Sequence, residues 1–179
     1  MLKTSKFMNL KHFFKILLFS GFLSIINSCQ PEQEKSTSFI LIRHAEKIIS
    51  SDNDPQLSTK GWKRANALVH IFEAVGIDAI YASPYRRSID TATPLATAKQ
   101  LEISNYIPSE LDSFAQKLLN THKGETVVIV GHSNTTPQLV NTLSGTNYPD
   151  LKETEYDWFY FVEMSPKGIP NVKKLQIRM

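Results

Sequence analysis

Cysteine is almost absent from this sequence, because Cys29 is the single one among 179 residues. One thiol excludes an intrachain disulfide framework and a zinc site built from several cysteines. A large excess of either charge is also lacking, since 20 Lys and Arg face 17 Asp and Glu, a formal net charge of +3. Four of those basic residues, all lysines, lie in residues 1–28, which contain no acidic residue. The remainder carries 16 basic and 17 acidic residues, a net charge of −1, and is not expected to bind nucleic acid.

The N-terminal segment has the layout of an export signal. Residues 1–15 are basic, and residues 16–26 form an apolar run of eleven residues. At about 1.5 Å per residue this run is too short for a hydrocarbon core of roughly 30 Å. It ends just before Cys29, and a polar linker follows. We therefore predict a signal peptide over residues 1–28, a linker over 29–37 and one globular domain over 38–179.

The segment around Cys29 resembles a bacterial lipoprotein signal. This resemblance implies that cleavage leaves a lipidated Cys29 as the new N-terminus. The exported protein would then be anchored to a bacterial membrane and face the periplasm or the cell surface. The alternative is a plain secretory signal with an incidental cysteine.

Short apolar runs alternate with segments of helical periodicity in the predicted domain. Strands are predicted at residues 39–42, 79–82, 104–107 and 126–130, and helices at 59–75, 86–100, 109–123 and 137–143. Residues 158–164 and 172–178 flank a Ser-Pro-Lys-Gly turn, which predicts a hairpin. Repeated strand–helix units favour an α/β three-layer sandwich, with a mostly parallel sheet, flanking helices and the C-terminal hairpin at one edge.

Three of the predicted strands run into residues with reactive side chains. The sequences that follow them are Arg-His-Ala-Glu (43–46), Ser-Pro-Tyr-Arg-Arg (83–87) and Gly-His-Ser-Asn (131–134). Ligands of such sheets bind outside the carboxyl ends of the strands, so we expect these segments to converge there. Arginine binds phosphate in a bidentate manner, and a histidine with a fixed tautomer can act as a nucleophile. The pattern predicts a site for one phosphoryl group that needs no metal and no other cofactor.

Four segments resemble elements of the histidine phosphatase, or phosphoglycerate mutase-like, superfamily. LIRHAEK (41–47) is similar to its Arg-His-Gly/Ala signature, and LSTKGWKRA (57–65) to its Leu-Thr-x-x-Gly-x-x-Gln-Ala element, with Arg64 where Gln is common. SPYRRSIDTA (83–92) is similar to its Ser-Pro-x-x-Arg-Ala-x-x-Thr-Ala element, and VVIVGHSN (127–134) to the strand with the second histidine. The resemblance covers about residues 38–145 and implies a phosphatase domain.

The resemblance also implies roles for particular residues. His44 would attack phosphorus and carry a transient phosphoryl group, while Arg43, Arg87 and His132 would bind the phosphoryl oxygens. Asn134 and Arg86 are further candidates for substrate binding. The partner would be a small phosphorylated substrate or a phosphohistidine protein. Walls of the pocket are expected in residues 45–56, 102–112 and 146–157.

The acid that would protonate the leaving group is not fixed by the sequence. About 44 residues separate Arg87 from His132, and Glu110 is the candidate acid among them, with Asp112 beside it. Glu46, next to the nucleophile, is another candidate. The structural alternative for Glu110 is that an acid in the first turn favours a helix. Glu46 has a structural role as its alternative as well. The compact chain resembles the short branch that contains phosphohistidine phosphatases, where a nitrogen leaving group demands less acid help.

There are three alternatives to hydrolysis of a phosphorylated substrate. A serine hydrolase centred on Ser133 is disfavoured, because no histidine follows His132 in the chain. A non-catalytic phosphate- or anion-binding envelope lipoprotein would keep the same fold without turnover. A phosphotransferase of the phosphoglycerate mutase type would use the same residues.

Overall fold

The computed structural model describes residues 35–178, so the predicted signal peptide, Cys29 and most of the predicted linker lie outside the described residues. The described residues form six strands and four helices. In chain order these are β1 (Thr37–Arg43), α2 (Thr59–Ile71), β2 (Ala79–Ala82), α3 (Arg86–Lys99), β3 (Ile103–Asn105), α4 (Leu111–Thr121), β4 (Thr126–Gly131), α5 (Thr135–Ser144), β5 (Trp158–Met164) and β6 (Pro170–Gln176). Within residues 35–178, no helix combines the length and the hydropathy needed to span a bilayer.

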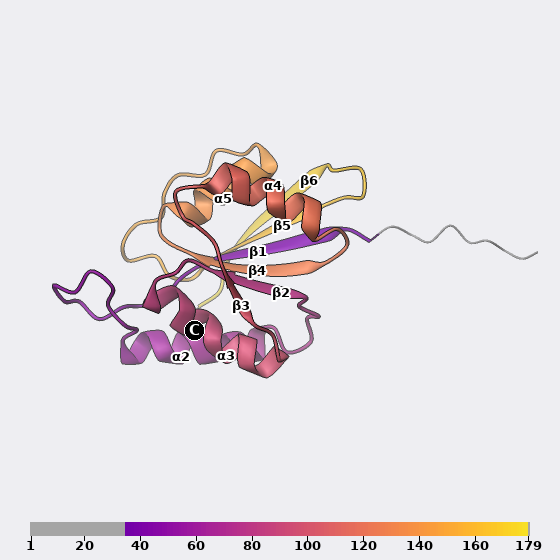
Figure 1. The fold of residues 1–179 in the computed structure, drawn as a ribbon. Helices are drawn as coiled ribbons and strands as arrows, with labels where there is room; N and C mark the ends of the chain where they lie inside the picture. The colour runs from indigo at the N-terminus through magenta and orange to yellow at the C-terminus, as the bar shows by residue number, and fades with distance from the viewer. Residues whose placement is uncertain (1–34, 179) are drawn as a thin grey trace, which may run out of the picture. The chain divides into compact units, whose positions relative to one another are not determined.

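The strands form one mixed sheet in the order β3-β2-β4-β1-β5-β6. β1 pairs in parallel with β4, and β2 lies parallel to both β4 and β3. β5 pairs antiparallel with β1, and β6 antiparallel with β5, so these last two strands form a hairpin at one edge. Figure 1 shows this hairpin beside β1. The predicted mostly parallel sheet with a C-terminal edge hairpin is confirmed.

Helices cover both faces of the sheet, with α4 and α5 on one side and α2 and α3 on the other (Figure 1). The alternation of side chains along β1 explains why residues 39–42 of this strand are all apolar. Phe39 and Leu41 pack in the core beneath α4 and α5, whereas Ile40 and Ile42 pack in the core beneath α2 and α3. A strand buried on both faces has no polar face to present. The predicted three-layer arrangement is therefore confirmed.

Several predicted helix boundaries differ from those in the structure by a few residues. The first helix ends at Ile71 rather than near residue 75, because Phe72 leaves the helical backbone conformation while its N–H still donates to the Leu68 carbonyl. The third helix begins at Leu111, since Glu110 has φ −121° and ψ 47°, outside the helical region.

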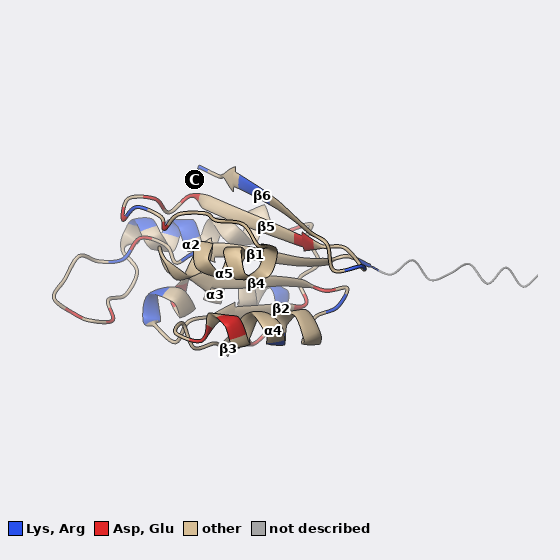
Figure 2. Ribbon diagram, turned by 90° about the horizontal axis from the view of Figure 1, so that it is seen from above, with Lys and Arg blue, Asp and Glu red and all other residues tan. Residues whose placement is uncertain are grey.

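Along the described ribbon, basic and acidic residues are interspersed (Figure 2).

Candidate active site

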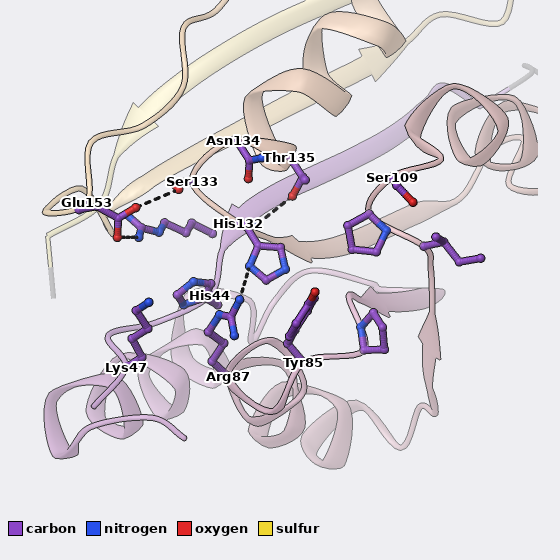
Figure 3. Close-up of a pocket in the computed structure, with 14 residues that line it drawn as sticks. His44, Lys47, Tyr85, Arg87, Ser109, His132, Ser133, Asn134, Thr135 and Glu153 are labelled. Carbon is purple, nitrogen blue, oxygen red and sulfur yellow. Dashed lines mark hydrogen bonds and ion pairs between the residues drawn. The ribbon is translucent and has the colours of Figure 1, made fainter. Parts of the chain in front are cut away.

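The carboxyl ends of β1, β2 and β4 border a cavity of about 660 Å³ (Figure 3). This is the sheet edge at which the reactive segments are predicted to meet. The 14 residues that line the cavity are Arg43, His44, Lys47, Pro84, Tyr85, Arg87, Ile107, Pro108, Ser109, His132, Ser133, Asn134, Thr135 and Glu153. Both histidines, both family-type arginines and Asn134 are therefore together, and each of the three segments expected to form pocket walls contributes lining residues.

His44 follows the last residue of β1 and is almost fully buried, with 3% exposure. Its backbone N–H donates to the Gly131 carbonyl at 2.8 Å, which continues the β1–β4 ladder into the site. Its ring Nδ1 lies 2.8 Å from the Ala45 carbonyl oxygen. A carbonyl only accepts, so the neutral ring holds its proton on Nδ1 and leaves Nε2 with a free lone pair. Burial, aided by the charges of Arg43, His132 and Arg87, lowers the pKa of His44 to about 3.

His132 follows β4 and has the opposite tautomer. Arg87 Nη2 donates to its Nδ1 at 3.3 Å, so Nδ1 is the unprotonated nitrogen. Its Nε2 donates to Ser83 Oγ at 2.8 Å, and that hydroxyl in turn donates to Ser88 Oγ at 2.7 Å. Burial, followed by the charges of Arg87 and Arg43, lowers the pKa of His132 to about 4. Both histidines are therefore neutral near pH 7.

Arg87 lies in the first turn of α3, and the loop before α2 fixes that turn. Asp54 accepts hydrogen bonds from the backbone N–H of Arg86 at 2.9 and 3.2 Å, so it caps α3 from 32 residues earlier in the chain. The same carboxylate lies 3.5 Å from Arg87 Nη1. The Arg87 guanidinium also lies over the Tyr85 ring, 4.5 Å from its centroid. Among the described residues, Arg87 Nε has no acceptor.

Arg43, the last residue of β1, is enclosed by the segment between α5 and β5. Its Nη1 donates to the carbonyls of Lys152 and Glu155 at 2.8 and 3.1 Å, and its Nη2 donates to Glu153 Oε2 at 3.0 Å. The Tyr156 ring lies against the guanidinium, 4.1 Å from Cζ to the ring centroid. Arg43 Nε has no acceptor within residues 35–178. In each arginine, therefore, the buried Nε–H has no acceptor among the described residues.

Small side chains allow the strand ends to approach one another at this edge. A Cβ on Gly131 would lie 2.8 Å from Thr136 Oγ1 and 2.9 Å from the Tyr106 hydroxyl oxygen, closer than real Cβ contacts. Glycine at this position therefore sets the direction of His132. The segment after β1 is held by Thr91, whose Oγ1 accepts the Ala45 N–H at 2.8 Å.

The structure does not bring Arg86 or Glu110 into the cavity. Arg86 is exposed, and its Nη2 donates to Gln56 Oε1 at 3.2 Å. Glu110 is also exposed, at the residue before α4. Asp112, beside it, accepts a hydrogen bond from Thr142 at 3.4 Å. These positions agree with the structural alternatives that the sequence left open.

The contacts of Glu46 make it poorly suited to protonate a leaving group. Arg64 Nε and Nη2 donate to its two carboxylate oxygens at 2.9 and 2.8 Å, and Lys60 lies 3.2 Å from Oε1. Burial alone would raise the pKa of Glu46, but the Arg64 hydrogen bonds outweigh it and lower the pKa to about 2. Glu46 is therefore ionised at neutral pH, and its ion pair with Arg64 joins the His44 segment to α2.

Sequence reasoning missed two charged residues of the cavity, Lys47 and Glu153. Lys47 belongs to the segment that carries the histidine signature, but no spacing rule indicates that its side chain faces the cavity. Glu153 lies 110 residues after Arg43 and meets it only through the fold. In the sequence, the one indication that Glu153 could line the cavity is its position in residues 146–157, a segment expected to form a pocket wall.

The arrangement of these residues is typical of a class of protein. A neutral histidine with a free Nε2 lies beside a second neutral histidine and between two arginines, which together suit a tetrahedral oxyanion and a nucleophilic attack on its centre. The fold and the site are those of an α/β protein that binds phosphoryl groups.

Residues 39–106 match the model of the histidine phosphatase superfamily (branch 1). The matched segment contains Arg43, His44 and Arg87, and His132 follows on the next strand of the sheet. Over this segment the chain is therefore similar to the histidine phosphatase superfamily.

Several characterised proteins are similar to this chain. Phosphoserine phosphatase 1 of Hydrogenobacter thermophilus is 39% identical over 70 residues, which is 36% of this chain and 33% of that protein. The chain thus matches about a third of the length of that relative. Among solved structures, the protein histidine phosphatase SixA complexed with tungstate has a TM-score of 0.62 at 18% identity, covering 78% of this chain and 96% of that one. A mycobacterial glucosyl-3-phosphoglycerate phosphatase has a TM-score of 0.65 at 12% identity, covering 80% and 99%. At these low sequence identities, the two structural matches establish a shared fold alone.

Proposed function

We propose that this protein is a phosphatase that hydrolyses a phosphomonoester or a phosphohistidine through a covalent phosphohistidine intermediate on His44. The observation that carries the proposal is the buried His44 ring, held by Ala45 so that Nε2 is free, at the base of a cavity with two arginines. The match of residues 39–106 to the model of the histidine phosphatase superfamily supports it.

The first step transfers the phosphoryl group to the enzyme. His44 Nε2 attacks phosphorus, and the N–P bond forms as the bond from phosphorus to the leaving atom breaks. Arg43 and Arg87 neutralise the negative charge on the equatorial oxygens, which is the main requirement of phosphoryl transfer. Because the pKa of His44 is about 3, the ring is already the free base at neutral pH and needs no separate base to activate it.

The second step releases phosphate. A water molecule attacks the phosphorylated His44, the new P–O bond forms as the N–P bond breaks, and the proton that the water gives up passes to a basic group at the cavity. His132 lies with its ring centroid 5.4 Å from that of His44, within reach of the transferred phosphoryl oxygens. Its Nδ1 accepts from Arg87 Nη2 at 3.3 Å, so His132 helps to hold that guanidinium in place at the cavity.

The cavity is larger than one phosphoryl group, so it has room for part of a substrate. Lys47, Ser109 and Asn134 line it beyond the two arginines and offer hydrogen bonds to such a body. Relatives with phosphoserine phosphatase and protein histidine phosphatase in their names make both small phosphomonoesters and phosphohistidine proteins reasonable substrates.

The proposal is tested by release of p-nitrophenol from p-nitrophenyl phosphate, with EDTA present. We infer that turnover needs no metal, since the arginines supply the charge that a metal would otherwise provide. The wild-type protein is expected to hydrolyse the ester in EDTA, and His44→Asn is expected to be inactive while unfolding at the same urea concentration. A folded wild type with no turnover would favour the anion-binding lipoprotein instead. Transfer of the phosphoryl group to a second alcohol rather than to water would favour a phosphotransferase.

We also infer that Cys29 is lipidated and anchors the exported domain to a bacterial membrane. A basic segment, a short apolar run and a cysteine at its end support this inference. In cells, the wild-type protein is expected in the membrane fraction and to incorporate labelled fatty acid. Cys29→Ala is expected to lose the label. Equal labelling of both forms would contradict lipidation at Cys29.

A further inference from the structure

Glu153 is the one carboxylate among the described residues that lines the cavity. We propose that Glu153 is the acid–base residue of the site, which protonates the leaving oxygen of a phosphomonoester and then takes a proton from the attacking water. This role rests on the proposed phosphatase function and fills the position that the sequence left open.

The geometry places the Glu153 carboxylate among groups that also line the cavity. Its Oε2 accepts from Arg43 Nη2 at 3.0 Å, and its Oε1 accepts from Ser133 Oγ at 3.3 Å (Figure 3). Its side chain is 75% exposed, whereas that of Arg43 is 2% exposed. Glu153 therefore reaches the buried arginine from the solvent side of the cavity. A leaving group must depart toward that side, because the buried His44 attacks from the opposite one.

The charges around Glu153 change when a phosphoryl group binds. Burial alone would raise the pKa of Glu153, but the Arg43 charge and hydrogen bond outweigh it, and the pKa is lowered. The carboxyl group is therefore ionised in the empty site. A phosphoryl group would take over the Arg43 charge and bring negative charge of its own, and both changes raise the pKa of a neighbouring carboxyl group. Binding of the substrate thus favours the protonated form that an acid needs.

The two proton transfers balance over one cycle. Glu153 Oε–H gives its proton to the leaving oxygen as the P–O bond breaks and the N–P bond to His44 forms, which yields an alcohol and a Glu153 carboxylate. That carboxylate accepts a proton from water as the new P–O bond forms and the N–P bond breaks. The cycle ends with phosphate, neutral His44 and protonated Glu153, which is ready for a second substrate or releases its proton to solvent.

The other titratable groups near the cavity are less suited to this role. Glu46 is held by Arg64, and Glu110 lies outside the cavity. The Nε2–H of His132 is engaged by Ser83. Tyr156 lies against the Arg43 guanidinium, and burial raises the pKa of its hydroxyl. Among these groups, Glu153 is the one best placed to carry the proton.

The leaving group of the substrate provides the test. A p-nitrophenolate departs without protonation, whereas the alkoxide of glycerol phosphate needs a proton. Glu153→Gln keeps the size and one oxygen that can still accept from Arg43, but it cannot exchange a proton. We expect this variant to lose about 10²–10⁴-fold in kcat/KM for glycerol phosphate and to lose far less for p-nitrophenyl phosphate. Asp150→Asn, which removes an exposed carboxylate from the same segment, is the matched control and should retain wild-type rates with both substrates.

Two results would overturn the role of Glu153 while leaving the phosphatase proposal intact. An equal loss with both substrates would mean that Glu153 only supports the site. A gain with both substrates would mean that it only competes with the phosphoryl group for Arg43. If the wild type hydrolysed neither ester, the proposed function itself would fail.

Discussion

The rings of His44 and His132 lie 5.4 Å apart, centroid to centroid, at an interplanar angle of 67°, and they hold their protons on opposite nitrogens. The Ala45 carbonyl keeps a proton on Nδ1 of His44, while Arg87 and Ser83 leave Nδ1 of His132 unprotonated. One ring therefore offers a nucleophilic Nε2, and the other offers a nitrogen that accepts a hydrogen bond from Arg87. This difference follows from the distinct partners that each strand end supplies, since the two side chains are chemically the same.

Adjacent arginines at the start of α3 allow a matched comparison. Arg87 lines the cavity and donates to His132, whereas Arg86 is exposed and donates to Gln56. We expect Arg87→Ala to lower kcat/KM for p-nitrophenyl phosphate by about 10²–10³-fold, as for the loss of one donor to a developing oxyanion. Arg86→Ala should stay near the wild-type value. Comparable losses in the two variants would show that the helix start acts as a general positive region instead.

The low pKa of His44 predicts how stability changes with pH. The pKa of a histidine is about 6.5 in an unfolded chain and falls to about 3 at this position. Between these values the unfolded chain binds the proton and the folded protein does not, so the free energy of unfolding falls as the pH falls. His44 contributes up to about 1.4 kcal/mol per pH unit in this window.

Urea unfolding between pH 6.5 and pH 5 measures this contribution, because the carboxylates begin to titrate at lower pH. The wild type should lose stability more steeply than His44→Asn, although His132 keeps some slope in both, since its pKa is also lowered, to about 4. Identical slopes would mean that His44 is not a buried neutral base.

Gly131 predicts a steric effect on the site. An added Cβ would meet Thr136 Oγ1 and the Tyr106 hydroxyl oxygen within 3 Å, so Gly131→Ala must shift the strand end that carries His132. We expect a loss of about 1–3 kcal/mol in the free energy of unfolding, together with a fall in kcat. Gly76→Ala is the control, because an added Cβ there meets nothing within 4 Å, and its stability should be unchanged or slightly raised. A fully stable and active Gly131→Ala would contradict this packing.

The Arg64–Glu46 pair should matter for stability more than for chemistry. Both side chains are nearly buried, at 10% and 12% exposure, so removal of Arg64 leaves a carboxylate with Lys60 as its remaining charged partner. We expect Arg64→Ala to lower the free energy of unfolding by about 3 kcal/mol, the low end for breaking a buried pair. Arg64→Gln should lose less, because its amide can still donate to Glu46. Equal stability of all three proteins in urea unfolding would show that the pair is dispensable.

The sequence predicts the fold well because the pattern of apolar residues in a strand indicates which of its faces are buried. The run Phe39–Ile42 is apolar throughout, and both faces of β1 are in fact covered. The convergence of Arg43, His44 and His132 is likewise predictable, since parallel strands bring their carboxyl ends to one edge. Glu153 and the pairing of Glu46 with Arg64 were not predictable, because each depends on contacts between distant segments that no periodicity encodes.

The central claim is that His44 carries the phosphoryl group, and direct detection of that adduct tests it best. The protein would be mixed with p-nitrophenyl phosphate, quenched within one turnover in alkali, where phosphohistidine survives, and analysed by peptide mass spectrometry. We expect one phosphoryl group per chain, on His44, and none in His44→Asn. Turnover with an unmodified His44, or a phosphoryl group on Ser133 instead, would contradict the account.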